Sequence, residues 1–172
     1  MEVLISKNTK SCLYRLGLYQ IIGGVLGVLI IFWAIFKSQV FSELTILVYL
    51  IMLLFFCYSI FCGTLCIQTK RNALIHSLTN QILQLFGIAI MGYALKYVAG
   101  FYLTIGLDLK DSIEFKFGAG ISKFDFNINN EKERLELDFN IVAFSFIIWI
   151  DKIMKKVKEE ENFRQTSSIG ES

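Results

Sequence analysis

Lys96 is the residue whose position most suggests a chemical role. It lies inside a hydrophobic stretch, residues 80–105, that is long enough to cross a membrane as a helix. An ionisable side chain at the centre of such a helix costs about 2.5–3.5 kcal/mol on insertion scales. We therefore expect Lys96 to pair with a carboxylate, for which the sequence offers Glu43, Asp108 and Asp111, or to extend its stem to the membrane surface. A role in lining a transport path or holding a ligand is the alternative.

Thiols and an imidazole are the residues that could bind a metal. Cys62 and Cys66 are spaced to share one helix face, and Cys12 and His76 are expected at a similar level. A thiolate site needs three or four converging ligands, and two on a helix with two on loops is an unspecific pattern. We therefore expect small packing residues at the cysteines and a solvated loop histidine, and we predict no metal and no cofactor.

Gly23 and Gly27 form a G-x-x-x-G pattern within an apolar run. Small residues at this spacing let two helix backbones approach closely. The pattern fits either a homo-oligomer or close packing inside one bundle, and the sequence alone leaves both open.

Motifs of known catalytic chemistry do not appear. The sequence has no H-E-x-x-H, no G-x-S-x-G, no phosphate-binding glycine loop and no paired Asp or His within a hydrophobic stretch. We predict no catalytic residues and a protein that is not an enzyme.

Apolar runs dominate the segments in which these residues lie. Only 19% of the 172 residues are charged, against about 25% in average soluble domains. Residues 44–67 carry no charge and would form a helix about 36 Å long, enough to cross a hydrocarbon core of about 30 Å. Residues 16–36 form a second run of this kind. The net charge of +2 gives no reason to expect nucleic-acid binding.

Two further stretches, which resemble membrane spans less closely, are predicted to form the third and fourth helices. Residues 80–105 are interrupted by Lys96 and several glycines, and residues 139–155 are short for a span. The tail at 156–172 is expected to begin as helix and to become disordered from Gln165 onward.

Residues 108–138 change period and alternate strictly between apolar and polar side chains. This alternation is typical of half-buried strands, and Gly118-Ala119-Gly120 and Asn129-Asn130 supply turn chemistry. We predict an antiparallel β meander of about three strands, whose apolar face packs on helix ends or lipid headgroups. That face consists of Ile113, Phe115, Phe117, Phe124, Phe126, Ile128, Leu135, Leu137 and Phe139.

The predicted fold is a single α-helical integral membrane domain with a four-helix transmembrane bundle and a small β meander between the third and fourth helices. Lys and Arg concentrate at the N-terminus, in the loop at 68–79 and in the tail. By the positive-inside rule these segments are cytoplasmic and the β segment is outside. A bacterial cytoplasmic membrane is the expected location.

The functional prediction is a non-enzymatic accessory, interaction or assembly protein of the membrane. Its expected partners are the lipid bilayer and either further copies of itself or another membrane protein. An oligomeric channel or transporter using Lys96 is the alternative, and an intramembrane enzyme is the least favoured hypothesis.

Overall fold

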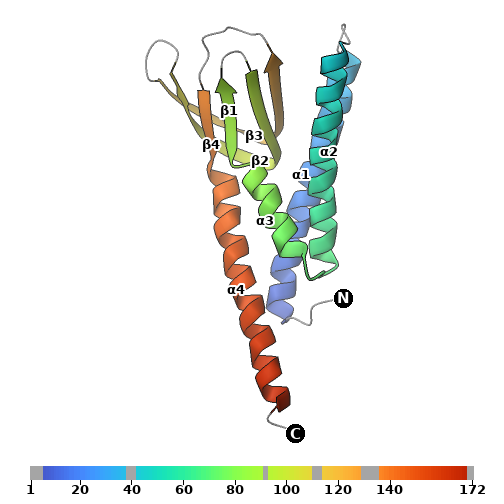
Figure 1. Ribbon diagram of the computed structural model, residues 1–172, viewed down its shortest axis with the longest axis vertical. Helices are drawn as coiled ribbons and strands as arrows, with labels where there is room; N and C mark the ends of the chain where they lie inside the picture. Colours follow the sequence, from blue (N-terminus) through green and yellow to red (C-terminus); the bar gives the residue numbers. More distant parts are fainter. Residues whose placement is uncertain (1–5, 38–41, 91–92, 110–113, 129–135, 170–172) are drawn as a thin grey trace.

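The computed structural model describes residues 6–37, 42–90, 93–109, 114–128 and 136–169. These residues form four helices and one four-stranded antiparallel sheet (Figure 1). The helices are α1 (Lys7–Lys37), α2 (Glu43–Ile67), α3 (Ala73–Leu83) and α4 (Ile141–Ile169). The strands are β1 (Phe86–Ile90), β2 (Tyr93–Asp108), β3 (Glu114–Ile128) and β4 (Glu136–Asn140).

Helices α1 and α2 form an antiparallel hairpin held by glycines. A side chain at Gly17 would meet the backbone oxygen of Gly63 at 2.6 Å, and one at Gly24 would meet that of Phe56 at 2.8 Å. Because only a hydrogen occupies these positions, the two backbones approach closely. Both helices are long and apolar enough to cross a membrane.

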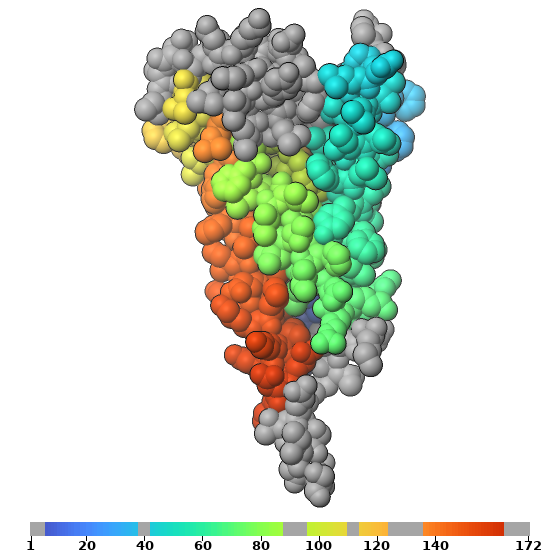
Figure 2. All heavy atoms as spheres, in the orientation of Figure 1, coloured from blue at the N-terminus to red at the C-terminus, as the bar shows by residue number. Residues whose placement is uncertain are grey.

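Helices α3 and α4 pack on one end of this hairpin. Figure 2 shows α3 on the surface between α2 and α4. A single apolar cluster joins all four helices, with Leu13, Leu16, Cys66, Ala73, Leu74, Ile150 and Ile153 as its buried members. The start of α1 and the end of α4 therefore lie at the same end of the molecule (Figure 1).

The sheet lies beside the other half of the hairpin and curls on itself (Figure 1). Strand β2 changes register with β3 between Val98 and Phe101, where Gly100 has a φ of +106° that favours glycine. On its other edge, the first part of β2 pairs with β1 and the last part pairs with β4, while β1 and β4 also pair with each other. Strands β1, β2 and β4 therefore pair with one another in a closed ring. Strand β3 pairs with the remaining edge of β2.

The predicted third membrane helix over 80–105 is wrong. Helix α3 ends at Leu83, and the remainder of this stretch belongs to strands β1 and β2. Hydropathy alone suggested a helix, but from Phe101 to Asp108 the sequence F-Y-L-T-I-G-L-D alternates with the period of a strand. Among the described helices, α1 and α2 meet the length and hydropathy of a span, so the four-span bundle is not confirmed.

The predicted three-strand meander is corrected to a larger sheet. β3 runs without a turn through Gly118-Ala119-Gly120, so the first two predicted strands are one strand. β4 matches the third predicted strand, whereas β1 and β2 come from the stretch assigned to a helix. The turn predicted at Asn129-Asn130 lies outside the described residues.

Helix α4 begins near the predicted position and continues beyond it. It extends through the predicted span 139–155 and most of the tail to Ile169, so the disorder predicted from Gln165 is contradicted up to that residue. The first half is apolar, and charged residues begin at Asp151 and Lys152.

Candidate functional site: the polar inner face of the sheet

Polar side chains and glycines share one face of the sheet, which we call the inner face. Residues paired across antiparallel strands point to the same face, so the register groups Gly106 with both Asp138 and Lys116. The inner face includes Gly87, Lys96, Tyr102, Thr104, Gly106, Asp108, Lys116, Gly118, Gly120, Glu136 and Asp138.

Lys96 is held at the centre of the inner face by a carboxylate. Its Nζ lies 2.5 Å from Oδ2 of Asp138, and the two side chains are 12% and 22% exposed. Lys96 Nζ also donates to the hydroxyl of Thr104 at 3.4 Å and lies 5.6 Å from the centre of the Tyr102 ring. The ammonium is therefore engaged from several sides within one chain.

A second ion-pair group lies further along the same face. Lys116 Nζ is 2.5 Å from Oδ2 of Asp108 and also contacts a carboxylate oxygen of Glu136. The residues come from β2, β3 and β4, so the group ties three strands together. The two carboxylates are more deeply placed than the lysine, at 16% and 15% exposure against 44%.

Glycines make the room that these side chains occupy. A Cβ at Gly106 would collide with Oδ1 of Asp138, and one at Gly118 would lie 2.8 Å from Oγ1 of Thr104. A Cβ at Gly120 would lie 2.9 Å from the hydroxyl of Tyr102. The glycines that the sequence suggested as turn residues therefore accommodate inner-face side chains within a continuous strand.

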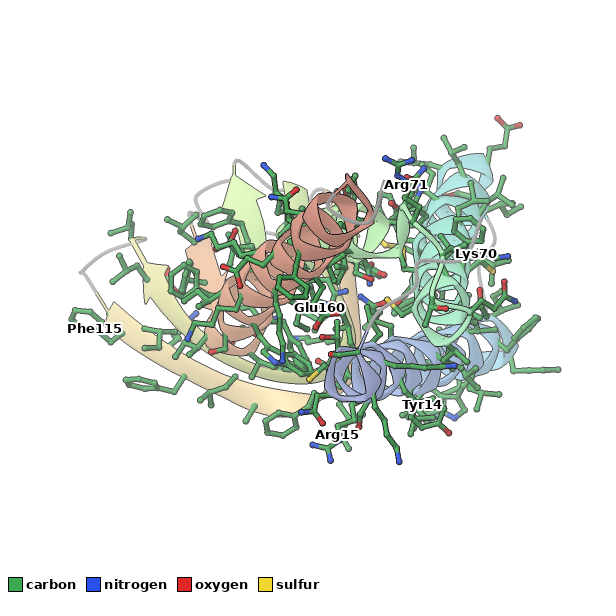
Figure 3. All side chains as sticks on the ribbon, turned by 90° about the horizontal axis from the view of Figure 1, so that it is seen from below. Tyr14, Arg15, Lys70, Arg71, Phe115 and Glu160 are labelled. Atoms are coloured by element: carbon green, nitrogen blue, oxygen red, sulfur yellow. The ribbon has the colours of Figure 1, made fainter. Side chains whose placement is uncertain are left out.

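The opposite face of the sheet, here called the outer face, is apolar and exposed. Phe117 is 76% exposed and Phe115 is 70% exposed. Figure 3 shows Phe115 at the far end of β3, pointing away from the helices. The exposed members of the outer face are Phe86, Phe101, Leu103, Ile105, Phe115, Phe117, Ile121 and Leu137. Of the apolar face predicted from the sequence, Phe115, Phe117 and Leu137 are exposed and do not pack on helix ends.

The predicted partners of Lys96 differ from the observed one. Asp108 interacts with Lys116 instead, and Glu43 lies at the start of α2. Asp111 lies outside the described residues. The premise that Lys96 is a charge within a spanning helix is also wrong, because Lys96 belongs to β2. Asp138 was missed as the partner of Lys96. The two residues come together only because β1 pairs with both β2 and β4, and no local sequence pattern reveals this pairing.

Gly23 and Gly27 are both used for packing within the chain. A Cβ at Gly23 would collide with the backbone nitrogen of Gly100, and one at Gly27 would collide with the Phe56 ring. Ser122 Oγ also donates to the carbonyl of Gly23 at 2.9 Å. This helix face therefore packs on the sheet and on α2 within the chain.

Cys62, Cys66 and His76, three of the four candidate metal ligands, are engaged in contacts between α2 and α3, and Cys12 on α1 packs against the four-helix apolar cluster. Cys62 Sγ donates to the carbonyl of His76 at 3.4 Å, and Cys66 Sγ lies 3.1 Å from Ser77 Oγ. His76 belongs to α3, not to a loop as predicted, and its Nδ1 lies 3.2 Å from the Tyr58 hydroxyl. Among the described residues, no group of three or more His, Cys, Asp or Glu is arranged to hold a metal.

A buried amide cluster joins the helices to the sheet and was not anticipated. Gln20 Oε1 accepts from Ser77 Oγ at 3.1 Å, and Asn80 Nδ2 donates to Ser59 Oγ at 3.1 Å. The Tyr97 hydroxyl reaches Asn80 Oδ1 at 3.3 Å. Gln81 is also buried, but neither its nitrogen nor its oxygen has a partner within the described part of the chain. The amides at 80, 81 and 84 in a hydrophobic stretch were the available signal.

These arrangements favour structural roles for the polar groups. The inner-face charges form ion pairs with one another, and the amide cluster ties α1, α2 and α3 to β2. No protein-family model, curated protein or solved structure matches this chain.

Proposed function

We propose that this chain is a non-enzymatic membrane protein that binds another membrane protein through its α1–α2 hairpin. The observation that carries the proposal is the exposure of that hairpin. In the most apolar 18-residue stretches of α1 and α2, only 28% and 22% of the stretch is buried within the chain. The core helix of a soluble protein would be mostly buried, so lipid or protein must cover these surfaces.

An apolar groove on the hairpin supplies a place for a partner. It has a volume of about 360 Å³ and lies near the α1–α2 connection. Its lining is apolar except for one tyrosine and consists of Ile31, Phe32, Ile35, Ile46, Tyr49, Leu50 and Leu53. A groove of this chemistry fits the side chains of another membrane helix.

Site-specific photo-crosslinking in native membranes tests the proposal. A photoreactive residue at Leu50, in the groove, is compared with one at Ile22, which is 50% exposed on α1 outside the groove. We expect one discrete protein adduct at Leu50, no such adduct at Ile22, and loss of the adduct when Leu53→Trp fills the groove. Adducts that are identical at both positions, or limited to lipid at Leu50, would overturn the proposal.

The proposed orientation has both chain ends in the cytoplasm, in a bacterial cytoplasmic membrane. Basic residues support it: Lys10, Arg15, Lys70 and Arg71 cluster at the end where α4 extends, against Lys37 at the opposite end. Single cysteines at Lys158 and Glu43, in a background without native cysteines, should react with an impermeant reagent from opposite sides of the membrane. Reaction of both from one side would contradict this orientation.

A channel or transporter that uses Lys96 is the second candidate, favoured only by the polar inner face. The pairing of Lys96 with Asp138 inside one chain weighs against it, because a transport path needs the cation to be available to a solute. Unchanged ion flux after Lys96→Met, with normal folding, would remove this candidate.

A further inference from the structure

Exposed charges mark one boundary of the apolar part of the molecule. The cluster that joins all four helices includes Leu16 of α1 and Ile150 of α4. The neighbouring residues Arg15, Asp151 and Lys152 are exposed, and Arg15 points away from the helices in Figure 3. The connection between α2 and α3 adds Lys70 and Arg71 next to the same cluster. Charges therefore begin next to this cluster on α1, on α4 and in the connection between α2 and α3.

The second boundary lies at the other end of the hairpin. α1 has no charge between Leu16 and Phe36, which is about 31 Å of helix at 1.5 Å per residue. The exposed charges Lys37 and Glu43 follow this stretch. The distance between the two charged levels matches a hydrocarbon core of about 30 Å.

The sheet lies between these two levels, not beyond them. Tyr97 and Ala99 of β2 share an apolar cluster with Ile31 of α1 and with Val48, Met52 and Phe56 of α2. Tyr97 also donates its hydroxyl hydrogen toward the Phe55 carbonyl at 2.8 Å, near the middle of α2. Figure 1 shows the strands alongside the half of the hairpin that leads to its connection.

The two faces of the sheet differ in polarity as do the two faces of a β-sheet embedded in a membrane. Charged and polar residues occupy the inner face, while the outer face bears exposed Phe, Leu and Ile, as in strands that face lipid. β4 is paired on both edges, β1 is so paired at Ile88 and Ala89, and β2 is so paired at 93–95 and 104–108, whereas β3 pairs with β2 alone among the described strands. Where both edges are paired, the backbone groups that hydrocarbon cannot hydrate are satisfied.

From these observations we infer that the outer face of the sheet is covered by lipid acyl chains in one leaflet. The membrane half nearest the chain ends holds four helices, and the other half holds two helices and the sheet. This inference rests on the proposed membrane location, and it adds that strands lie at hydrocarbon depth beside the hairpin.

Quenching of tryptophan fluorescence by lipids brominated on their acyl chains tests the inference in reconstituted vesicles. The background is the full chain with Trp33→Phe and Trp149→Phe. Single tryptophans are then placed at Phe117 on the outer face, at Leu29 on α1 (58% exposed) and at Phe163 on α4 (75% exposed). Ile121→Trp provides a second outer-face position that does not depend on the folding of one variant.

We expect brominated lipid to reduce the emission of Phe117→Trp and Ile121→Trp as strongly as that of Leu29→Trp, and to leave Phe163→Trp unaffected. Outer-face tryptophans quenched by aqueous iodide, with Leu29→Trp still quenched by lipid, would overturn the inference and leave the membrane location intact. Outer-face tryptophans shielded from both quenchers would also overturn it, because another protein copy would then cover the face. If Leu29→Trp is not quenched either, the membrane location itself fails.

Discussion

The helical hairpin and the sheet present the same polarity to their surroundings by different means. Both turn apolar side chains outward and keep polar groups inside. Each helix satisfies its backbone within one segment, whereas strands depend on partners that can be 51 residues away in the chain, as Gly87 is from Asp138. The hairpin is therefore robust to changes in its outward side chains, while the sheet depends on specific inner-face groups.

Loss of the Asp138 carboxylate should destabilise the sheet more than any other single change considered. Asp138→Ala leaves the ammonium of Lys96, only 12% exposed, without its carboxylate partner. Removing one member of a fully buried pair costs about 3–5 kcal/mol, and the loss should approach the lower end of this range because Asp138 is 22% exposed. The free energy of unfolding in mixed micelles measures this. Lys96→Met combined with Asp138→Leu should recover most of the loss, and a double variant as unstable as Asp138→Ala would contradict the explanation.

Separating the hairpin from the sheet should have the next largest effect. Gly23→Ala places a methyl group against the backbone at Gly100, which cannot move aside as a side chain can. We expect a loss of about 1–3 kcal/mol in the free energy of unfolding. Val25→Ala on the exposed side of α1 is the matched control and should change stability by less than about 0.5 kcal/mol.

The amide cluster allows a test in which one polar group is dispensable and its neighbour is not. Gln81 is buried without a described partner, so Gln81→Leu should leave stability unchanged or raise it by about 1 kcal/mol. Asn80→Leu removes the groups bonded to Ser59 and Tyr97 and should lower stability by about 1–3 kcal/mol. Equal losses in the two variants, measured by thermal unfolding, would show that Gln81 is also engaged.

The smallest effect is expected where α4 meets the start of α1. Burial raises the pKa of Glu160, but hydrogen bonds donated by Ser6 and Thr9 outweigh it and hold the pKa below its ordinary value of 4.5. The folded state therefore favours the carboxylate, and its contribution is present above pH 4.5 and is lost as the pH falls further. Glu160→Gln should cost about 1 kcal/mol at neutral pH.

Unfolding measured across this pH range checks the sign. The difference between the wild-type chain and Glu160→Gln should shrink as the pH falls below 4.5. A difference that grows in acid would contradict the proposed contact.

The sequence predicts the hairpin well because each helix is specified locally. The ranges 16–36 and 44–67 lie within α1 and α2, and the end of the β segment matches β4. The prediction of a helix over 80–105 was wrong because the hydropathy of this stretch resembles that of a span, although the alternation of its side chains after Gly100 indicates a strand. Lys96 was a sound choice as an unusual charge, but its partner depends on a long-range register that neither composition nor spacing contains.

The ring of β1, β2 and β4 has a consequence for biosynthesis. β4 lies at residues 136–140, so during translation β1 and the last part of β2 are made long before the strand that completes their pairing. Until then these edges need water or a chaperone, because hydrocarbon cannot hydrate them. We therefore expect the hairpin to insert first and the sheet to move into the membrane only after β4 has emerged. A chain truncated before β4 would retain the hairpin and leave its strands outside the lipid.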